Sequence, residues 1–168
     1  EAYTVHHMLQ TACREAGDAA GAARVQALID RHELKHKAPE ASVYIGGALH
    51  VLTTGRSARH LNAAVEDLCT SLTAGVGYRP VLAAVPYDRA RDQSLDEQCA
   101  ALLLHPEKVA LAQLLADGAD TLDVTINFRT CADCHAFFEA AALYLGQPIT
   151  LHEPKRAHTF GKRGCSCG

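Results

Sequence analysis

Two pairs of closely spaced cysteines constrain what this chain can fold into. Cys131 and Cys134 are separated by two residues, and Cys165 and Cys167 by one. The chain has seven cysteines, an odd number that makes a poor disulfide framework. Thiolate metal sites in a reducing compartment fit these spacings better. The sequence therefore predicts a fold organised around metal-binding cysteines.

A histidine and a glutamate precede the first pair, in the run His105-Pro-Glu107. One histidine and two cysteines leave the fourth tetrahedral position of Zn²⁺ for water, as catalytic zinc sites do. A carboxylate two residues after the histidine can reach that water without binding the metal. Zinc-dependent nucleobase deaminases combine the same parts, with a non-ligand glutamate that moves protons. We therefore predict His105, Cys131 and Cys134 as zinc ligands and Glu107 as the proton shuttle.

A second interpretation of these residues stays open. Cys131 and Cys134 can form half of a zinc-finger-like structural site, because a lone C-x2-C spacing serves both purposes. Glu107 is then an ordinary acid in the first turn of a helix.

The second cysteine pair has two histidines as candidate partners. Two histidines and two cysteines close a tetrahedral zinc site with no open position, which is the structural kind. The predicted donors are His135, His158, Cys165 and Cys167. His152 is a competing ligand, and the alternative to a metal site is a free tail with a reducible C-x-C pair. A zinc ion here would clip the tail to the helix that begins near Cys134.

Hydrophobic periodicity places these motifs on helices and strands. Apolar spacing predicts two short helices within residues 1–34 and a helix over 58–74. Gly46-Gly47, between two β-rich runs, predicts a hairpin. Residues 76–95 hold two prolines and mixed charges, which indicates a loop, either a lid or a plain connector.

The second half of the chain predicts a helix, a strand, a helix and a strand. Residues 95–116 are helical with a break at His105-Pro106, because proline is accommodated at the first position of a helix. Residues 121–128 alternate as a half-buried strand, 132–145 form an alanine-rich helix, and 147–152 form another strand. The last sixteen residues read as a basic, glycine-containing tail.

The charge of the chain limits how it can bind a nucleic acid. The formal net charge is −3, whereas domains that hold nucleic acid by phosphate contacts alone are usually basic. The basic tail residues Lys155, Arg156, Lys162 and Arg163 are candidates for RNA contact, or simply a solvated surface. No run approaches the roughly 18–20 apolar residues of a membrane helix, so we expect no membrane partner.

Four segments strongly resemble one known family. They are His105-Pro-Glu-Lys-Val-Ala-Leu-Ala112, Ile126-Asn-Phe-Arg-Thr-Cys-Ala-Asp-Cys-His135, His158-Thr-Phe160 and Gly164-Cys-Ser-Cys-Gly168. Together they resemble the DYW deaminase domain that closes many plant-type pentatricopeptide-repeat RNA-editing factors. Residues 39–60 look like a divergent PG box, which opens that domain, and residues 1–36 resemble the helical E-type motifs before it.

The resemblance implies a fold, a cofactor and a substrate. It implies an α/β, cytidine-deaminase-like fold, with a central mixed β-sheet flanked by helices, a short N-terminal helical extension and a zinc-clipped tail. It implies two zinc ions per chain, one catalytic and one structural. It also implies conversion of cytidine to uridine in single-stranded RNA of a mitochondrion or chloroplast, with the target chosen by an upstream repeat array in the same or a partner chain.

The same resemblance divides the chain into three parts. These are a helical extension over 1–36, a PG-box-like linker and hairpin over 37–60, and a zinc-dependent deaminase domain over 61–168. We expect the sequence to be part of a longer polypeptide. The oligomeric state is not indicated.

This chain departs from the family pattern at several positions. Pro106 replaces the usual serine, Val43 a common tryptophan and Thr159 a histidine. The given sequence ends at Gly168, before the position of the family's terminal Asp-Tyr-Trp, through either truncation or divergence. Lys37-Ala-Pro-Glu-Ala41 faintly resembles the opening motif of a branch associated with the reverse, uridine-to-cytidine conversion. That reverse activity is one alternative. A non-catalytic, zinc-stabilised module that recruits a deaminase in trans is the other.

Overall fold

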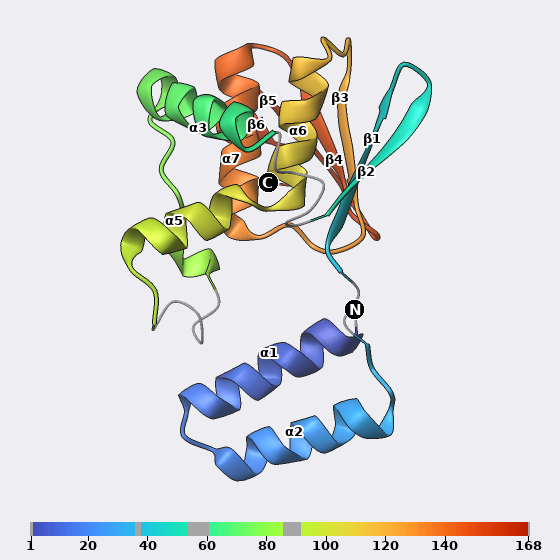
Figure 1. The fold of residues 1–168 in the computed structure, drawn as a ribbon, viewed down its shortest axis with the longest axis vertical. Helices are drawn as coiled ribbons and strands as arrows, with labels where there is room; N and C mark the ends of the chain where they lie inside the picture. Colours follow the sequence, from blue (N-terminus) through green and yellow to red (C-terminus); the bar gives the residue numbers. More distant parts are fainter. Residues whose placement is uncertain (1, 36–37, 54–60, 86–91, 168) are drawn as a thin grey trace. The chain divides into compact units, whose positions relative to one another are not determined.

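Figure 1 shows the computed structural model, which describes residues 2–35, 38–53, 61–85 and 92–167. Contacts divide the chain into two compact units, Glu1–Ala38 with Pro86–Gln93, and Pro39–Val85 with Ser94–Gly168. The division into an extension, a linker with hairpin and a deaminase domain stays a prediction.

The first unit contains a helical hairpin formed by α1 (Ala2–Glu15) and α2 (Ala19–Arg31). Gly17, with a φ of 72°, turns the chain between the helices. The Asp18 carboxylate then caps α2 by accepting a hydrogen bond from the backbone N–H of Gly21 at 2.7 Å. Gln10 of α1 donates to Gln26 Oε1 of α2 at 2.8 Å. The two helices expected in residues 1–34 are therefore present.

Within this unit, α1 keeps large apolar side chains exposed. Val5, Met8 and Leu9 are 63 %, 67 % and 53 % exposed, although their spacing predicts a buried stripe. The hairpin alone does not cover them. A stripe of this kind is a surface on which another helix can pack.

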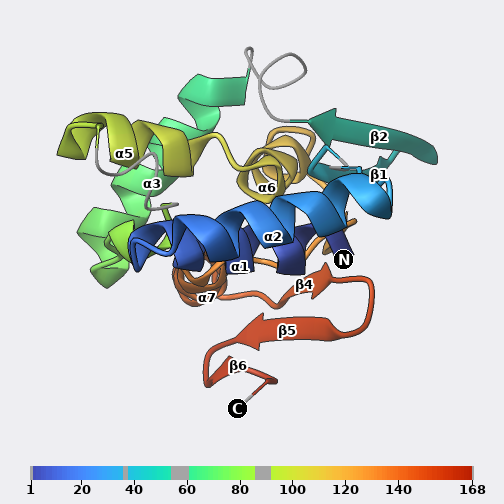
Figure 2. The same cartoon turned by 90° about the horizontal axis from the view of Figure 1, so that it is seen from below.

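The second unit is built on a six-stranded mixed sheet in the order β2-β1-β3-β4-β5-β6 (Figures 1 and 2). Its strands are β1 (Glu40–Ile45), β2 (Ala48–Thr53), β3 (Leu122–Ile126), β4 (Ile149–His152), β5 (Ala157–Gly161) and β6 (Gly164–Cys165). Only β3 and β4 pair in parallel; the other neighbouring strands of this sheet are antiparallel. The expected α/β architecture with a central mixed sheet is confirmed.

The turn between β1 and β2 is the hairpin that the two glycines predicted. Gly46 and Gly47 have φ values of 57° and 81°. Two successive positive φ angles are what a two-residue turn of this twist requires, and glycine adopts them without a steric penalty.

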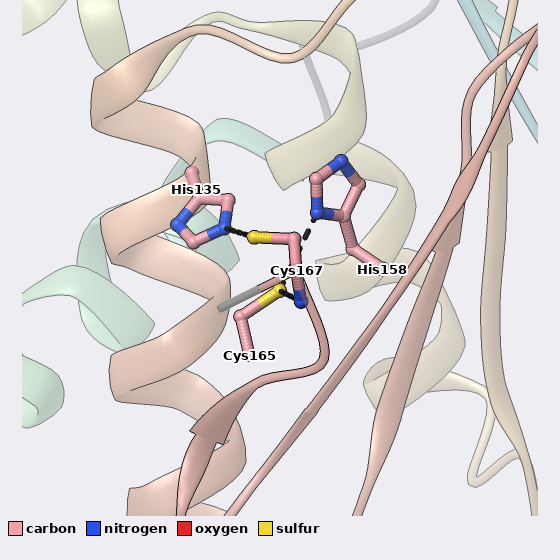
Figure 3. Close-up of side chains that lie close together, drawn as sticks. All are labelled: His135, His158, Cys165 and Cys167. Carbon is pink, nitrogen blue, oxygen red and sulfur yellow. Dashed lines mark hydrogen bonds between the residues drawn. The ribbon is translucent and has the colours of Figure 1, made fainter.

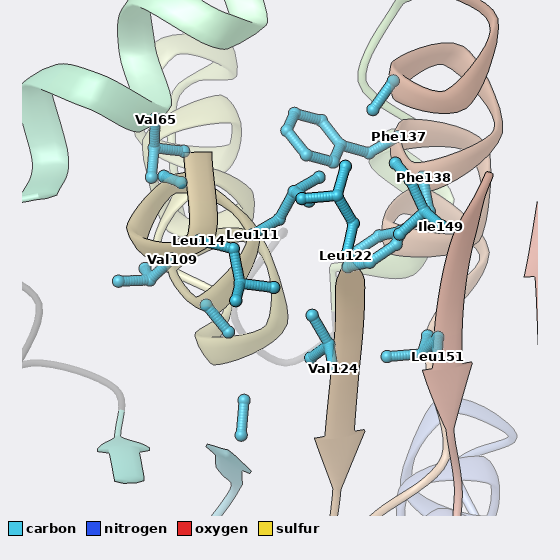
Figure 4. Packing of buried hydrophobic residues seen from close by; sticks show 14 of the residues in the cluster. Val65, Val109, Leu111, Leu114, Leu122, Val124, Phe137, Phe138, Ile149 and Leu151 are labelled. Atoms are coloured by element: carbon cyan, nitrogen blue, oxygen red, sulfur yellow. The ribbon is translucent and has the colours of Figure 1, made fainter. Parts of the chain in front are cut away.

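Helices cover one face of the sheet. They are α3 (Asn62–Val76), α5 (Leu95–Leu103), α6 (Pro106–Ala116) and α7 (Ala132–Leu145), with a 3₁₀ turn, η2 (Leu82–Ala84). Leu122 and Val124 of β3 are buried on this face, whereas Asp123 and Thr125 are exposed on the other. Figure 4 shows the resulting core between α6, α7 and the two parallel strands.

The connection from β3 through α7 to β4 positions the site. A parallel pair needs such a crossover, and the helix starts beyond the carboxyl end of the first strand. Ligands in open α/β sheets bind at this end of the strands. The segment from Asn127 to Cys131, which leads from β3 into α7, lies there.

Some expectations concern residues that are not described. Residues 58–60 of the expected 58–74 helix and residues 86–91 of the expected 76–95 loop lie outside the described residues. Within the described ranges no single helix is long and apolar enough to cross a membrane, although α5 and α6 reach that length and composition as a pair bent by 57°. Most of α6 is buried in the core of the second unit.

Candidate metal centres

The first candidate ligand lies where α6 begins. His105 is the N-cap residue, with extended backbone angles (φ −65°, ψ 131°), and Pro106 occupies the first helical turn. Proline is favoured there because the first N–H groups of a helix have no partner inside it. Glu107 follows in the same turn, and its side chain is buried. The break expected at His105-Pro106 is thus a helix start that presents both side chains together.

The two candidate cysteine ligands lie where α7 begins. Cys131 is the N-cap residue of α7, and its Sγ accepts a hydrogen bond from the backbone N–H of Cys134 at 3.4 Å. The C-x2-C spacing therefore puts both sulfurs at one end of the helix. A helix N-terminus favours thiolates because its free N–H groups carry partial positive charge.

The two helix starts meet. His105 Nδ1 lies 3.3 Å from Cys134 Sγ and 3.5 Å from Cys131 Sγ. Nitrogen and sulfur ligands at about 2.0 and 2.3 Å from one tetrahedral zinc ion lie about 3.5 Å apart, so these distances match such a centre. One oxygen of Glu107 also belongs to this group, whose donor atoms all lie within 4.8 Å of one another. We call His105, Glu107, Cys131 and Cys134 the first group.

Glu107 lacks a partner in its buried position. Its side chain is 0 % exposed, and neither carboxylate oxygen has a hydrogen-bond partner among the described residues. Burial raises the pKa of this carboxyl group. A buried polar group without a partner is costly, so its presence here indicates that a ligand of the group completes it. The donor set of the first group fits zinc.

The two thiols of the first group differ in acidity. The side-chain hydrogen bond with Cys134, together with that from His105, lowers the pKa of the Cys131 thiol to about 4. Burial raises the pKa of the Cys134 thiol. Cys131 is therefore the more readily ionised of the pair, and the thiolate is the form that binds metal.

The second group gathers the other four predicted donors (Figure 3). His135 Nε2 lies 3.3 Å from Cys167 Sγ, and His158 Nδ1 lies 3.4 Å from Cys165 Sγ. All four donor atoms lie within 4.8 Å of one another. Two histidines and two cysteines are a complete tetrahedral set for structural zinc. His152, the competing candidate, is exposed in β4 and belongs to neither group.

The tail that carries the second group is an ordered hairpin rather than an irregular segment. Phe160 pairs with Cys165 across β5 and β6, and the Ser166 N–H donates to the Thr159 carbonyl at 2.9 Å. The turn is completed by Gly164, with a φ of 97°. The sequence patterns predicted a tail rather than strands here, and a two-residue strand such as β6 carries almost no periodicity. The alternation of buried His158 and Phe160 with exposed neighbours was the available signal.

The four candidate RNA-contacting cations form two separate pairs. Lys155 and Arg156 precede β5, whereas Lys162 and Arg163 follow it. At roughly 3.3 Å per residue the strand separates the pairs by about 20 Å. Arg156 Nε also donates to Glu153 Oε2 at 2.8 Å. All four side chains are exposed, and their contact with RNA stays a prediction.

Sequence analysis also missed a buried ion pair between the same two helix starts. Lys108 Nζ lies 2.5 Å from Asp133 Oδ2, with the side chains 1 % and 0 % exposed. Asp133 Oδ1 accepts hydrogen bonds from Tyr78 Oη and the Val81 N–H, each at 2.8 Å. The Lys108 ammonium group lies 4.8 Å from the centre of the Phe137 ring. The sequence did contain a signal for this pair. Lys108 directly follows Glu107, and Asp133 directly precedes Cys134, so each charge lies within a predicted site motif.

Comparison with known proteins identifies the family. The fold and the two groups define an α/β domain with two sites suited to metal ions. Residues 77–168 match the DYW family of nucleic acid deaminases, which is more than half of the chain, and the chain belongs to this family.

The relatives are pentatricopeptide repeat-containing proteins. One from Arabidopsis thaliana is 34 % identical over 169 residues, covering 96 % of this chain and 25 % of the relative. Another from Arabidopsis thaliana, named as mitochondrial, is 36 % identical over 96 residues, covering 56 % of this chain and 16 % of the relative. One from Oryza sativa subsp. japonica, also named as mitochondrial, is 29 % identical over 129 residues, covering 73 % of this chain and 21 % of the relative. The chain thus spans a quarter or less of the length of these relatives.

Proposed function

We propose that this chain is the catalytic part of an RNA-editing protein and converts cytidine to uridine in single-stranded RNA. The observation that carries the proposal is the buried, unpartnered Glu107 carboxylate beside an imidazole and two thiols. Membership of a family of nucleic acid deaminases supports it.

Each residue of the first group has a role in this reaction. His105, Cys131 and Cys134 would hold the zinc ion, and Glu107 would stay free of it. A zinc ion with three protein ligands acts as a Lewis acid toward water. Glu107 accepts one proton from the attacking water and delivers it to the ring nitrogen. It then accepts the second proton from the hydroxyl group at C4 and delivers it to the leaving amine, so it ends as it began. Cytidine and water give uridine and ammonia.

The substrate and partners follow from the same proposal. The base that a deaminase converts must be unpaired and unstacked from its neighbours to enter the active site, which favours single-stranded RNA as substrate. The net charge of −3 means that affinity for RNA comes largely from elsewhere. We assign that role to an upstream pentatricopeptide-repeat array, since the relatives are much longer repeat-containing proteins. We place the protein in a mitochondrion or chloroplast; two of the relatives are named as mitochondrial, which supports an organellar location.

The second group holds a structural zinc ion in this proposal. His135, His158, Cys165 and Cys167 supply four protein donors, which leaves no position for substrate. Its role is to fasten the β5–β6 hairpin to the start of α7. The chain then binds two zinc ions.

The test compares Glu107→Gln with the unchanged chain, each joined to its repeat array. We expect Glu107→Gln to keep both zinc ions and to lose cytidine-to-uridine conversion by about 10²–10⁴-fold, the usual contribution of general acid–base catalysis. Asp123→Asn, an exposed carboxylate on the far face of β3, is the matched control and should edit normally. Equal editing by Glu107→Gln refutes the mechanism, and conversion of uridine to cytidine by the unchanged chain supports the reverse activity instead.

A second candidate function has one observation in its favour. An oxygen of Glu107 lies within 4.8 Å of the three other donor atoms, so Glu107 can also be counted as a fourth ligand. A closed site of four protein ligands suits a non-catalytic module that recruits a deaminase in trans. The zinc content of Glu107→Gln separates the two candidates. Loss of one zinc ion favours the module, and retention with loss of editing favours the enzyme.

A further inference from the structure

The carboxylate of Glu153 lies between the two groups. Glu153 directly follows β4, and its side chain is 3 % exposed. It is not a member of either group of donor atoms. Sequence analysis assigned it no role.

One oxygen of this carboxylate contacts segments from both groups. Glu153 Oε1 accepts a hydrogen bond from the backbone N–H of Thr130 at 2.9 Å. The same oxygen lies 3.3 Å from His158 Nε2. Thr130 immediately precedes Cys131 of the first group, and His158 is a donor of the second. The other oxygen, Oε2, accepts from Arg156 Nε at 2.8 Å.

The topology of the sheet explains this position. Because β3 and β4 are parallel, the segment after β3 and the segment after β4 emerge at the same edge. Thr130 lies in the first segment and Glu153 in the second. The Glu153 N–H then donates to the Arg156 carbonyl at 2.8 Å, and this turn leads into β5, which carries His158.

The orientation of the His158 ring makes Glu153 its natural hydrogen-bond acceptor. His158 Nδ1 faces Cys165 Sγ, so Nδ1 is the nitrogen that would bind a metal ion. In Figure 3 the other ring nitrogen points away from the two cysteines. A histidine that binds metal through one nitrogen carries its proton on the other, and a carboxylate that accepts this proton fixes the ring.

We infer that Glu153 is a positioning residue for both metal centres. It orients His158 for the second ion and, through the Thr130 N–H, holds the backbone that presents Cys131 to the first. The inference rests on the proposed metal centres. The consecutive residues Cys134 and His135 already join the two groups on α7, and Glu153 adds a second connection through the ends of β3 and β4.

The experiment measures the zinc affinity of each group alone, in the full 168-residue chain. The first group is isolated by Cys165→Ser with Cys167→Ser, and the second by Cys131→Ser with Cys134→Ser. Affinity comes from competition with a chromogenic chelator, and the visible spectrum of the cobalt-substituted chain reports ligand geometry. Neither measurement depends on catalytic activity.

Glu153→Ala is introduced into both isolated backgrounds. Loss of an outer hydrogen-bond partner of a ligand costs about 10–100-fold in metal affinity, so we expect a loss of this size at the second group. At the first group we expect a loss of roughly tenfold with a shifted cobalt spectrum, because the Thr130 N–H loses its acceptor. The matched control is Glu66→Gln, an exposed carboxylate on α3, which should change neither group.

Glu153→Gln keeps an oxygen acceptor but removes the charge. We expect the first group to keep its affinity within about threefold, and the second to weaken by roughly tenfold, since a neutral amide polarises His158 less. If Glu153→Ala does not fold by circular dichroism, Glu153→Gln still tests the second group, where an unchanged zinc affinity refutes the positioning of His158. A first group that is indifferent to both variants, in chains that bind zinc normally, refutes the coupling and leaves the proposed function intact. Absence of zinc binding in the two parent backgrounds refutes the metal centres themselves.

Discussion

The buried pair of Lys108 and Asp133 offers the sharpest test of how the two helix starts are held together. Asp133→Asn removes one charge with almost no change in volume. The remaining Lys108 ammonium group is 1 % exposed and has no route to water without movement of α6 or α7. The second variant, Lys108→Met, is the converse change with a side chain of similar length.

The environment of each charge sets the magnitude. Removing one partner of a buried ion pair costs about 3–5 kcal/mol, because the other charge is left uncompensated. Asp133→Asn should reach the upper end of that range. Lys108 would keep only Tyr78 Oη, at 3.3 Å, and the faces of nearby rings. Lys108→Met should cost less, about 3 kcal/mol, because Asp133 still accepts hydrogen bonds from Tyr78 Oη and the Val81 N–H.

The double variant separates this account from simple loss of packing. With both charges gone, an asparagine oxygen still accepts from Tyr78 and the Val81 N–H. The double variant should therefore be destabilised by only about 1–2 kcal/mol, less than either single variant. The coupling free energy of the cycle, taken as the cost of the double variant minus the summed costs of the single variants, is then large and negative, as expected for residues in direct contact.

Urea unfolding at a fixed excess of zinc, monitored by circular dichroism, gives the free energy of unfolding of the parent chain, the two single variants and the double variant. The slope with urea should stay constant across the set, since the same surface is exposed on unfolding. Single variants within 1 kcal/mol of the parent chain, or a double variant as unstable as the worse single one, refute the reasoning.

Three further predictions use other parts of the second unit. Cys165→Ser with Cys167→Ser should release one of two zinc ions and lower the melting temperature, and retention of both ions in a metal assay contradicts the second site. Burial, followed by the neighbouring Asp133, raises the pKa of Tyr78, so its contribution to stability is complete below about pH 10 and is lost as the pH rises further. In Tyr78→Phe the free energy of unfolding should therefore fall less steeply as the pH rises above about 10. An unchanged pH dependence contradicts this role of Tyr78. Ser94→Ala should cost about 1 kcal/mol in urea unfolding, because Ser94 and Glu97 form a capping box at α5; a cost near zero contradicts that role.

Much of the fold could be predicted from local patterns in the chain. The hairpin at Gly46-Gly47, the helix start at Pro106 and the helix that begins within Cys131–Cys134 all depend on residues close together in sequence. Their boundaries were near those of the structure for this reason. The β5–β6 hairpin was missed, because a two-residue strand carries almost no periodicity and is held by pairing with its neighbour.

The contacts around the site could not be predicted in the same way. A lysine or aspartate in a helical motif reads as a solvated charge, and only packing of α6 against α7 turns Lys108 and Asp133 into a buried pair. Glu153 likewise gained its position from the parallel pairing of β3 and β4. The strand–helix–strand pattern over 121–152 is compatible with that pairing, but the side chains that meet at its end are decided by packing.

The sequence by itself indicated the chemistry: which residues can bind zinc, and that the residues of the first group stand at the starts of two helices. These properties are local, because capping and the spacing within one helical turn are decided by near neighbours. The tertiary structure alone decided which of these local pieces meet. The approach of His105 to Cys131 and Cys134, the burial of Glu107 beside them and the return of the tail to His135 all result from sheet order and core packing, which bring together residues far apart in the chain.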